Sequence, residues 1–428
     1  MTTSINCVEL TIDKRHLEWI KYGKLLIFAC YFVYVAELAA KFVFGAEIAT
    51  IIVELKTDKV NASFANTYYF IVYGLVQVIL SFLMGKIDMR KYLVVTLPFA
   101  AITMICMGFA TNIEFMWIIF PISGIFQAGL WSGINLILTK YLPACLLNTA
   151  NRVINTGVAV SSIIAYGMSA VCVSYVGWRM PFFILGTVFL ISAVFFAFVV
   201  RKTQNYADIL DDTTLFNGDK DIDNNSLFTL NTRKQTVAFY CISIVMVFLI
   251  TSVYNSLCNW LPSLLIDVFS FRQDVSIYVS ILSPVVMLFG PMLTLWSCAR
   301  DKNFIRQCLI YSSIILLICI LLTFLYQTNV ILAVLLFVLY MGLANGIRVI
   351  VLSVITFQLH TQINAGTYSA ISNAVASVSS GVIPTFFGFL IDSYGWKNAF
   401  SFTIILLGVI IVLLFVLMIL VNLMNNRK

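Results

Sequence analysis

The stretch LLIFACYFVYVAELAAKFVFGAEIATIIV, residues 25–53, is apolar except for Glu37, Lys41 and Glu47. It is longer than the about 20 apolar residues that an α-helix needs to cross a bilayer. A charge at the centre of a membrane helix costs about 2.5–3.5 kcal/mol on insertion scales, so it faces a partner, a bundle interior or a water-filled path. Glu37 and Lys41 therefore mark a candidate site. Their i, i+4 spacing also favours an ion pair within the helix, and simple mutual neutralisation is the alternative interpretation.

The composition of the whole chain agrees with this first stretch. Of 428 residues, 61% are hydrophobic and 11% are charged, against roughly 25% charged residues in soluble proteins. Apolar windows long enough to span a bilayer recur along the chain, and we predict an all-α membrane protein with twelve transmembrane helices. The predicted spans are residues 25–53, 64–84, 92–110, 115–138, 153–176, 181–200, 237–261, 275–298, 308–326, 330–355, 368–391 and 399–423.

Basic residues are distributed unevenly between the two ends of these spans. If the N-terminus is cytoplasmic, 19 of the 26 Lys and Arg residues lie in cytoplasmic segments and 5 lie in outer segments. Cytoplasmic loops of membrane proteins are enriched in Lys and Arg. We therefore predict that both termini are cytoplasmic. The net charge of +7 follows from this bias and requires no nucleic-acid partner.

A polar stretch, residues 201–236, divides the spans into two sets of six. Its charge and low apolar content favour a flexible cytoplasmic linker. We predict a cytoplasmic N-terminal segment (1–24), an N-terminal six-helix bundle (25–200), the linker (201–236), a C-terminal six-helix bundle (237–423) and a cytoplasmic tail (424–428). The first 24 residues carry no small-residue cleavage site, so we expect no removable signal peptide.

An internal repeat relates the two halves at an offset of 218 residues. The segment 155–182 overlays the segment 373–400, and each contains a Gly-Trp pair near its end. The same offset aligns Gln127 with Asn345. Two equivalent six-helix halves are the plan of alternating-access transporters, whose substrate site lies near the midplane between the halves.

Several motifs resemble the major facilitator superfamily. The run GKIDMRK, residues 85–91, lies between the second and third spans, where that superfamily has a Gly-x-x-x-Asp-Arg-type motif, with Asp88 one residue out of register. Within the superfamily, the organophosphate:phosphate antiporters of glycerol-3-phosphate and hexose phosphates are the most similar branch. That likeness rests on residues 124–131 (GIFQAGLW), 259–262 (NWLP), 365–367 (AGT) and the Gly395-Trp396 turn. The resemblance implies that the first, fourth, seventh and tenth spans line a central cavity.

The chain departs from this branch at the positions that bind phosphate in it. By alignment, Lys41 keeps one member of the basic pair in the first span, whereas Ala40 replaces the arginine. The seventh-span arginine falls at Tyr254, and the fifth-span histidine falls near Val158. Because arginine supplies the bidentate hydrogen bonds that favour phosphate dianions, these departures argue against a strict phosphate exchanger.

Arg348 in the tenth span offers a replacement cation. It shares a helix face with Asn345, and Lys41 and Arg348, one from each half, would form a clamp for a small organic anion. Alternatively, Arg348 extends toward the membrane interface or pairs with Glu37 or Glu47.

Neutral side chains on the same four spans complete the predicted site. Asn255 and Asn259 align with Glu37 and Lys41 at the offset of 218. Amides and hydroxyls bind polar solutes but also join helices, for about 0.6 kcal/mol each, and the sequence leaves both roles open. The predicted substrate-binding residues are Lys41, Arg348, Tyr34, Gln127, Trp131, Asn255, Asn259 and Asn345.

Glu37 is the predicted proton-coupling residue. A carboxylate that alternates between pairing with a lysine and binding a proton is the usual chemistry of a proton symporter. Glu47 lies near the outer end of the first span, where we expect a surface position. If the chain exchanges one anion for another, as the resembled branch does, it requires no proton carrier.

No catalytic motif suggests an enzyme. The chain lacks a Gly-x-x-x-x-Gly-Lys-Ser/Thr loop, a Gly-x-Ser-x-Gly elbow and a His/Glu metal motif, so we expect no enzyme activity, no cofactor and no metal. We predict a monomeric, multi-pass transporter of a bacterial plasma membrane. It would move a sugar phosphate or organic acid by anion exchange or proton symport. A membrane sensor or receptor of such a solute is the alternative.

The predicted topology can be tested by cysteine labelling of intact cells. Asn217→Cys in the linker and Asn426→Cys in the tail should not react with a membrane-impermeant maleimide, because both positions are expected to be cytoplasmic. Lys56→Cys, in the first predicted outer segment, serves as the reactive control. Ready labelling of either Asn217→Cys or Asn426→Cys would refute the topology.

Overall fold

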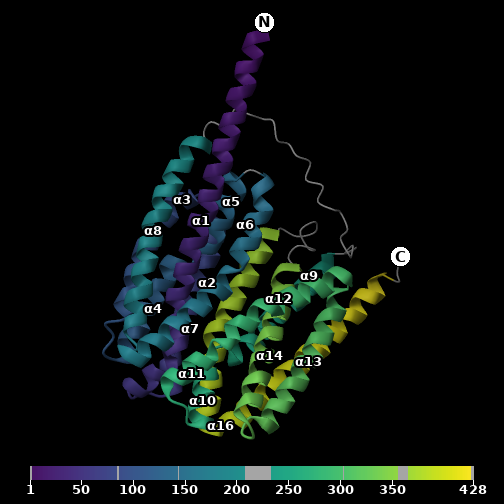
Figure 1. Ribbon diagram of the computed structural model, residues 1–428. Helices are drawn as coiled ribbons and strands as arrows, with labels where there is room; N and C mark the ends of the chain where they lie inside the picture. Colours follow the sequence, from purple (N-terminus) through teal and green to yellow (C-terminus); the bar gives the residue numbers. More distant parts are fainter. Residues whose placement is uncertain are drawn as a thin grey trace.

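The protein is an all-helical bundle in a computed structural model (Figure 1). The structure describes residues 2–83, 86–142, 144–207, 233–301, 303–354 and 365–425, and these contain no β-strand. Most helices lie side by side along one direction, and the N-terminal part of α1 extends beyond the others (Figure 1). The predicted all-α membrane fold is confirmed.

In the described part of the first half, the chain forms eight helical segments. They are α1 (Thr2–Glu54), α2 (Lys59–Leu83), α3 (Met89–Met107), α4 (Ile113–Gln127), α5 (Leu130–Tyr141), α6 (Ala144–Asn155), α7 (Gly157–Tyr175) and α8 (Met180–Ala207). The second half contains α9 (Arg233–Leu257), α10 (Leu261–Phe269), α11 (Gln273–Ser280), α12 (Leu282–Arg300), α13 (Phe304–Leu325), α14 (Val330–Val349), the π-helix η1 (Ile350–Val354) and α16 (Ala365–Asn425).

Some predicted spans are broken or merged in the structure. Among the described residues, ten helices are long and apolar enough to cross a membrane, or eleven if the bent pair α9 and α10 counts as one span. That pair is bent by 42°, and Pro262 in the first turn of α10 lacks an N–H to continue the α9 ladder. The last two predicted spans both lie in α16, whose backbone is non-helical at Gly395. The count of twelve therefore stays a prediction.

The internal repeat is visible in the backbone. Gly177 and Gly395, which the offset of 218 aligns, have positive φ angles of 96° and 79°, a conformation that glycine adopts without steric cost. Each is followed by a buried tryptophan that packs on the phenylalanine four residues later. The ring centroids are 6.1 Å apart for Trp178 and Phe182 and 5.9 Å apart for Trp396 and Phe400. The same turn thus joins the fifth and sixth spans and the two parts of α16.

The short loops before α3 and α13 are each closed by an Asp–Arg ion pair. Asp88 caps α3, accepting hydrogen bonds from the Arg90 backbone N–H at 3.0 Å and from Arg90 Nε at 3.2 Å. Hydrogen bonds from Arg90 lower the pKa of the Asp88 carboxyl. Asp301 accepts from Arg306 Nε at 2.7 Å, which lowers its pKa in the same way. Arg90 also lies over the ring of Tyr141, at 4.7 Å, so the start of α3 contacts the end of α5.

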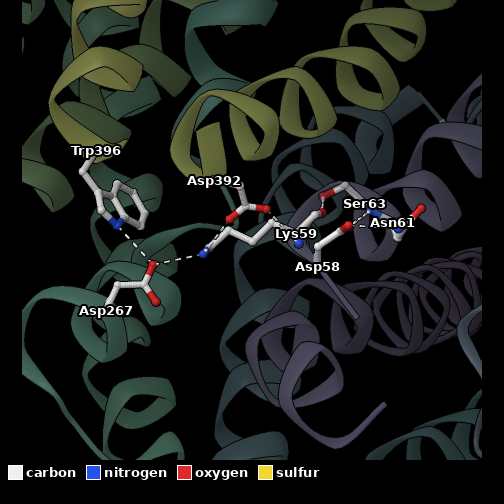
Figure 2. A network of polar contacts seen from close by, with 7 residues as sticks. All are labelled: Asp58, Lys59, Asn61, Ser63, Asp267, Asp392 and Trp396. Atoms are coloured by element: carbon white, nitrogen blue, oxygen red, sulfur yellow. Dashed lines mark hydrogen bonds and ion pairs between the residues drawn. The ribbon is translucent and has the colours of Figure 1, made fainter. Parts of the chain in front are cut away.

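The two halves are joined by polar contacts at one end of the bundle. Lys59, at the start of α2, lies 3.2 Å from Asp267 in α10 and 3.0 Å from Asp392 in α16. Trp396 Nε1 donates a hydrogen bond to Asp267 at 3.1 Å, and Figure 2 shows the resulting network. Farther along α2, the Thr67 hydroxyl donates to the backbone oxygen of Gly381 at 2.8 Å. We call the end that contains Lys59, Asp267 and Asp392 the closed end.

Helices α12 and α14 approach most closely at glycines. A Cβ on Gly290 would overlap the backbone carbonyl of Gly342, and a Cβ on Gly346 would lie 2.9 Å from the Gly290 oxygen. Gly342 and Gly346 form a Gly-x-x-x-Gly pair, a spacing that lets membrane helices pack backbone to backbone.

Gly290→Ala should destabilise the protein, because the new methyl group must push α12 away from α14. Overpacking of this kind costs about 1–3 kcal/mol, and the apparent melting temperature in detergent measures the loss. Gly408→Ala in α16 is the matched control, since a Cβ there meets nothing within 4 Å. Equal melting temperatures for the two variants would contradict the close approach.

Candidate functional site

Glu37 and Lys41 form an ion pair within α1. Lys41 Nζ lies 3.6 Å from Glu37 Oε1, and the two side chains are only 13% and 4% exposed. The same ammonium faces the rings of Tyr69 and Tyr73 in α2, at 6.0 and 5.8 Å from their centroids. A cation this close to an aromatic face is attracted to it, so Lys41 is held by one carboxylate and by two tyrosines.

Gln127 in α4 is held against this cluster. It accepts a hydrogen bond from the Tyr69 hydroxyl at 2.6 Å and donates one to the Ser123 hydroxyl at 2.6 Å. Both of its polar atoms therefore have protein partners. Tyr69 connects Gln127 to Lys41, because its hydroxyl binds the amide and its ring faces the ammonium.

Tyr34 and Trp131 pack against each other one turn before Glu37. Their ring centroids are 5.3 Å apart, which joins α1 to α5. Gly157 at the start of α7 leaves room for Tyr34, since a Cβ at that position would lie 2.8 Å from a Tyr34 ring carbon. An aromatic wall thus adjoins the ion pair.

Arg348 in α14 has neutral partners. Its Nε and Nη2 donate to Asn345 Oδ1 at 3.2 and 2.9 Å, and its guanidinium lies 4.6 Å from the ring centroid of Tyr254 in α9. Within the described residues no ion pair includes Arg348. The alternative in which Arg348 pairs with Glu37 or Glu47 is therefore wrong.

Asn345 and Gln127 occupy equivalent places in the two halves. Asn345 Nδ2 donates to the backbone oxygen of Met287 in α12 at 3.0 Å, and the offset of 218 aligns Met287 with Tyr69. An amide at equivalent positions therefore connects α4 to α2 in the N-terminal half and α14 to α12 in the C-terminal half. The difference is that the N-terminal half supplies a tyrosine hydroxyl where the C-terminal half supplies backbone.

The two clusters, one in each half, are linked by electrostatics. The Tyr34 hydroxyl interacts with the charges of Glu37 in its own helix and Arg348 in the other half. Arg348 also lies two residues before the π-helical turn η1, and such turns are frequent at functional sites. The predicted residues Tyr34, Glu37, Lys41, Gln127 and Trp131 thus come together, as do Asn345 and Arg348.

Asn255 and Asn259 serve contacts between helices. Asn255 Nδ2 donates to the Ser380 hydroxyl in α16 at 2.9 Å. Asn259 lies in the break between α9 and α10, so close to α1 that a Cβ on Gly45 would be 2.8 Å from its Oδ1. Asn255 therefore joins two helices of one half, whereas Asn259 lies where the halves meet, one turn beyond Lys41.

Sequence reasoning did not select the three tyrosines that face the cations. Tyr69 and Tyr73 are spaced by four residues in the second span, a pattern that marks one helix face, and Tyr254 was noted only as the position of a missing arginine. The surface position expected for Glu47 is wrong, because its side chain is 0% exposed. In the described part of the chain, no group of His, Cys, Asp and Glu side chains could hold a metal ion.

Solved structures with the same fold are transporters. The chain is similar to a bacterial homologue of the human lysosomal transporter Spinster in an inward-facing and unoccupied conformation. The TM-score is 0.74 and the identity 13%, over 94% of this chain and 98% of that one. It is also similar to the nucleoside transporter NupG, with a TM-score of 0.63 and 16% identity over 93% of this chain and 98% of that one. At these identities the likeness shows the fold alone.

The sequence comparison identifies the family. No curated protein matches the chain, and the organophosphate:phosphate branch stays a prediction. The family model described as Major Facilitator Superfamily, however, matches residues 28–384, which is most of the chain and includes both candidate clusters. This chain therefore belongs to the major facilitator superfamily of membrane transporters.

Proposed function

We propose that this protein transports a small organic anion by alternating access and that Arg348 is its principal anion-binding group. The observation that carries the proposal is the set of neutral partners around Arg348. A cation inside a membrane bundle is expensive without a counter-charge, and Asn345 and Tyr254 supply none. An anionic solute would provide that charge.

The geometry of Arg348 leaves hydrogen-bonding capacity for a solute. A guanidinium group has five N–H donors, and two of its nitrogens bind the single Asn345 oxygen. The remaining donors suit a carboxylate or a phosphate, which accept paired hydrogen bonds from arginine. Sugar phosphates and organic acids both carry such groups.

Lys41 plays a different part because it is already paired. An anion that binds Lys41 must compete with Glu37, and the displaced carboxylate is then free to bind a proton. This competition supports proton symport through Glu37. In an exchange of one anion for another, the second anion would take the place of the first at Lys41, and no proton would be required. The rings of Tyr34, Trp131, Tyr69 and Tyr73 offer apolar faces beside these polar groups, the mixture found in small-molecule sites.

The conformation fits one step of an alternating-access cycle. The charge bias of the sequence predicts that Lys59, Asp267 and Asp392, where the halves are joined, face the outer side of a plasma membrane. The closed end is then the outer end, and the site faces the cytoplasm. The likeness to an inward-facing transporter structure supports this assignment.

Removing the Arg348 charge should weaken anion binding selectively. Arg348→Ala loses hydrogen bonds to a charged group, worth about 1.5–3 kcal/mol, so the Kd of an anionic solute should rise roughly 10- to 150-fold. Thermal-shift binding across sugar phosphates, hexuronates, carboxylates, amino acids and nucleosides identifies the solute, and uptake into proteoliposomes measures transport. Lys41→Ala should abolish that uptake while the protein still folds.

Arg300→Ala is the matched control for Arg348→Ala. Arg300 also stacks on an aromatic ring, that of Trp296 at 3.9 Å, but it is exposed at the end of α12, so this variant should transport normally. Transport of a neutral solute at the parental rate by both Lys41→Ala and Arg348→Ala would contradict the proposal that Lys41 and Arg348 bind an anion.

Glu37→Gln tests the coupling. The amide resembles a permanently protonated carboxyl, so under symport the variant should still bind and exchange solute yet lose accumulation driven by a pH gradient. Proteoliposome uptake with and without the gradient separates the two activities. Accumulation equal to the parent's would make Glu37 a structural partner of Lys41 and favour anion exchange.

A further inference from the structure

Glu47 is a buried carboxyl group without a counter-charge. Its side chain is 0% exposed, and neither carboxylate oxygen has a hydrogen-bond partner among the described residues. An ionised carboxylate is strongly disfavoured in such a place, and a buried acid normally takes up a proton instead. Glu37, by contrast, has Lys41 beside it.

The groups around Glu47 are polar but uncharged. Its polar neighbours are the hydroxyls of Thr50 in α1 and Ser169 in α7, and these hydroxyls also lack partners in the described part of the structure. Cys172, a thiol in α7, is the titratable group that interacts with Glu47 electrostatically. The packed surfaces nearby also carry the phenol of Tyr166 in α7.

Two charged residues at the start of the neighbouring helix α11 form an ion pair with each other. Asp274 accepts hydrogen bonds from Arg272 at 3.0 Å and from Ser174 of α7 at 3.4 Å. Arg272 is mostly exposed and pairs with Asp274. Arg272, the cation of this pair, therefore does not provide Glu47 with a counter-charge.

Glu47 lies where the two halves of the protein meet. The adjacent Ala46 forms a small buried cluster with Tyr166 and Ala170 of α7 and Ile277 of α11. Helices α1 and α7 belong to the N-terminal half and α11 to the C-terminal half. Glu47 is therefore buried beside the contact that α11 makes with α1 and α7 when the halves are joined.

This position is separate from the candidate anion site. Ten helical residues from Glu37 to Glu47 correspond to about 15 Å along α1 and to a face turned by about 80°. Glu37 lies with Lys41, Tyr69 and Tyr73, whereas Glu47 lies with Thr50 and Ser169. The two carboxyl groups of α1 thus have different surroundings and different tasks.

We propose that Glu47 is a proton-binding site, occupied while the halves are joined at the closed end. When α11 separates from α1 and α7, water reaches the carboxyl group and it exchanges its proton with the solution on that side. Rejoining the halves requires the protonated form, because the ionised form would be buried without a partner. Each closure then encloses one proton, which comes from the solution on that side and returns to it when the halves separate again, so a low pH on that side favours closure. The binding site itself does not depend on the proposed function, whereas its effect on transport rests on it.

Infrared difference spectroscopy of the purified protein in lipid nanodiscs tests the site directly. At neutral pH the parent should show the C=O stretching band of a protonated carboxylic acid, and this band should be lost in Glu47→Gln. Glu54→Gln is the matched control, since Glu54 lies two turns later in α1 and is exposed, and it should keep the band. Glu47→Asp should also keep it, at a shifted frequency, which covers the case in which Glu47→Gln folds poorly.

Two outcomes would overturn the proton site. One is the absence of the band in the parent, or its persistence in Glu47→Gln. The other is evidence that the oxygens of Glu47, Thr50 and Ser169 bind sodium instead of a proton. That evidence would be a higher melting temperature in Na⁺ than in K⁺ for the parent but not for Glu47→Gln. The proton site predicts equal melting temperatures in the two salts.

Transport then tests the effect on closure. In proteoliposomes, solute exchange by the parent should become faster as the pH on the side of the closed end is lowered, while Glu47→Gln should keep exchange but lose this pH dependence and Glu54→Gln should keep both. A pH dependence equal to the parent's in Glu47→Gln would overturn the effect on closure even if the band is lost. If the parent transports none of the solutes, the proposed function fails, and the infrared result still decides whether Glu47 binds a proton.

Discussion

The cost of a charge inside the bilayer governs the interior of this protein. The acidic and basic side chains of Glu37, Lys41, Glu47 and Arg348 lie within apolar helices, and they meet that cost in three different ways. Glu37 and Lys41 neutralise each other at 3.6 Å. Arg348 rests on an amide and an aromatic ring, and Glu47 has two hydroxyls nearby and no charge. The interior therefore contains a lysine paired with a glutamate, an arginine with neutral partners only, and a buried glutamate without a counter-charge.

The pseudo-symmetry of the fold makes these differences possible. The two halves repeat the same turns at Gly177 and Gly395 and the same tie between their second and fourth helices through Gln127 and Asn345. Against this common frame, the acid and base of α1 are replaced by two asparagines in the seventh span, and Arg348 of α14 is replaced by Leu130 in the N-terminal half. The repeat supplies a symmetric frame, and the substitutions give it an uneven charge.

The junction between the halves combines close packing with a few polar contacts. Lys59 reaches two aspartates of the other half (Figure 2), and Thr67 reaches the backbone of Gly381. Such contacts between partly exposed charges are individually weak, so they hold the halves together without making separation prohibitive. That balance suits a molecule that must open and close.

The sequence by itself determined the helical membrane fold, because hydropathy and helix period are local properties of the chain. It also determined the Glu37–Lys41 pair and the shared face of Asn345 and Arg348, since residues three or four apart on a helix meet whatever surrounds them. The sequence likewise revealed the internal repeat and its two Gly-Trp turns, because segments 155–182 and 373–400 align at an offset of 218 residues.

Only the tertiary structure decided which groups lie opposite these residues. Tyr69 and Tyr73 face Lys41 across a helix boundary, and the ring under Arg348 comes from α9 rather than α14. Asn255 and Asn259 have the spacing of a binding pair, yet one bonds Ser380 and the other meets Gly45. Glu47 looked like a surface residue because its distance from the end of the span is local information. Its surroundings come from α7 and from the nearby contact between Ala46 and α11. Both helices are distant from α1 in the sequence, and no helical period encodes contacts between segments so far apart.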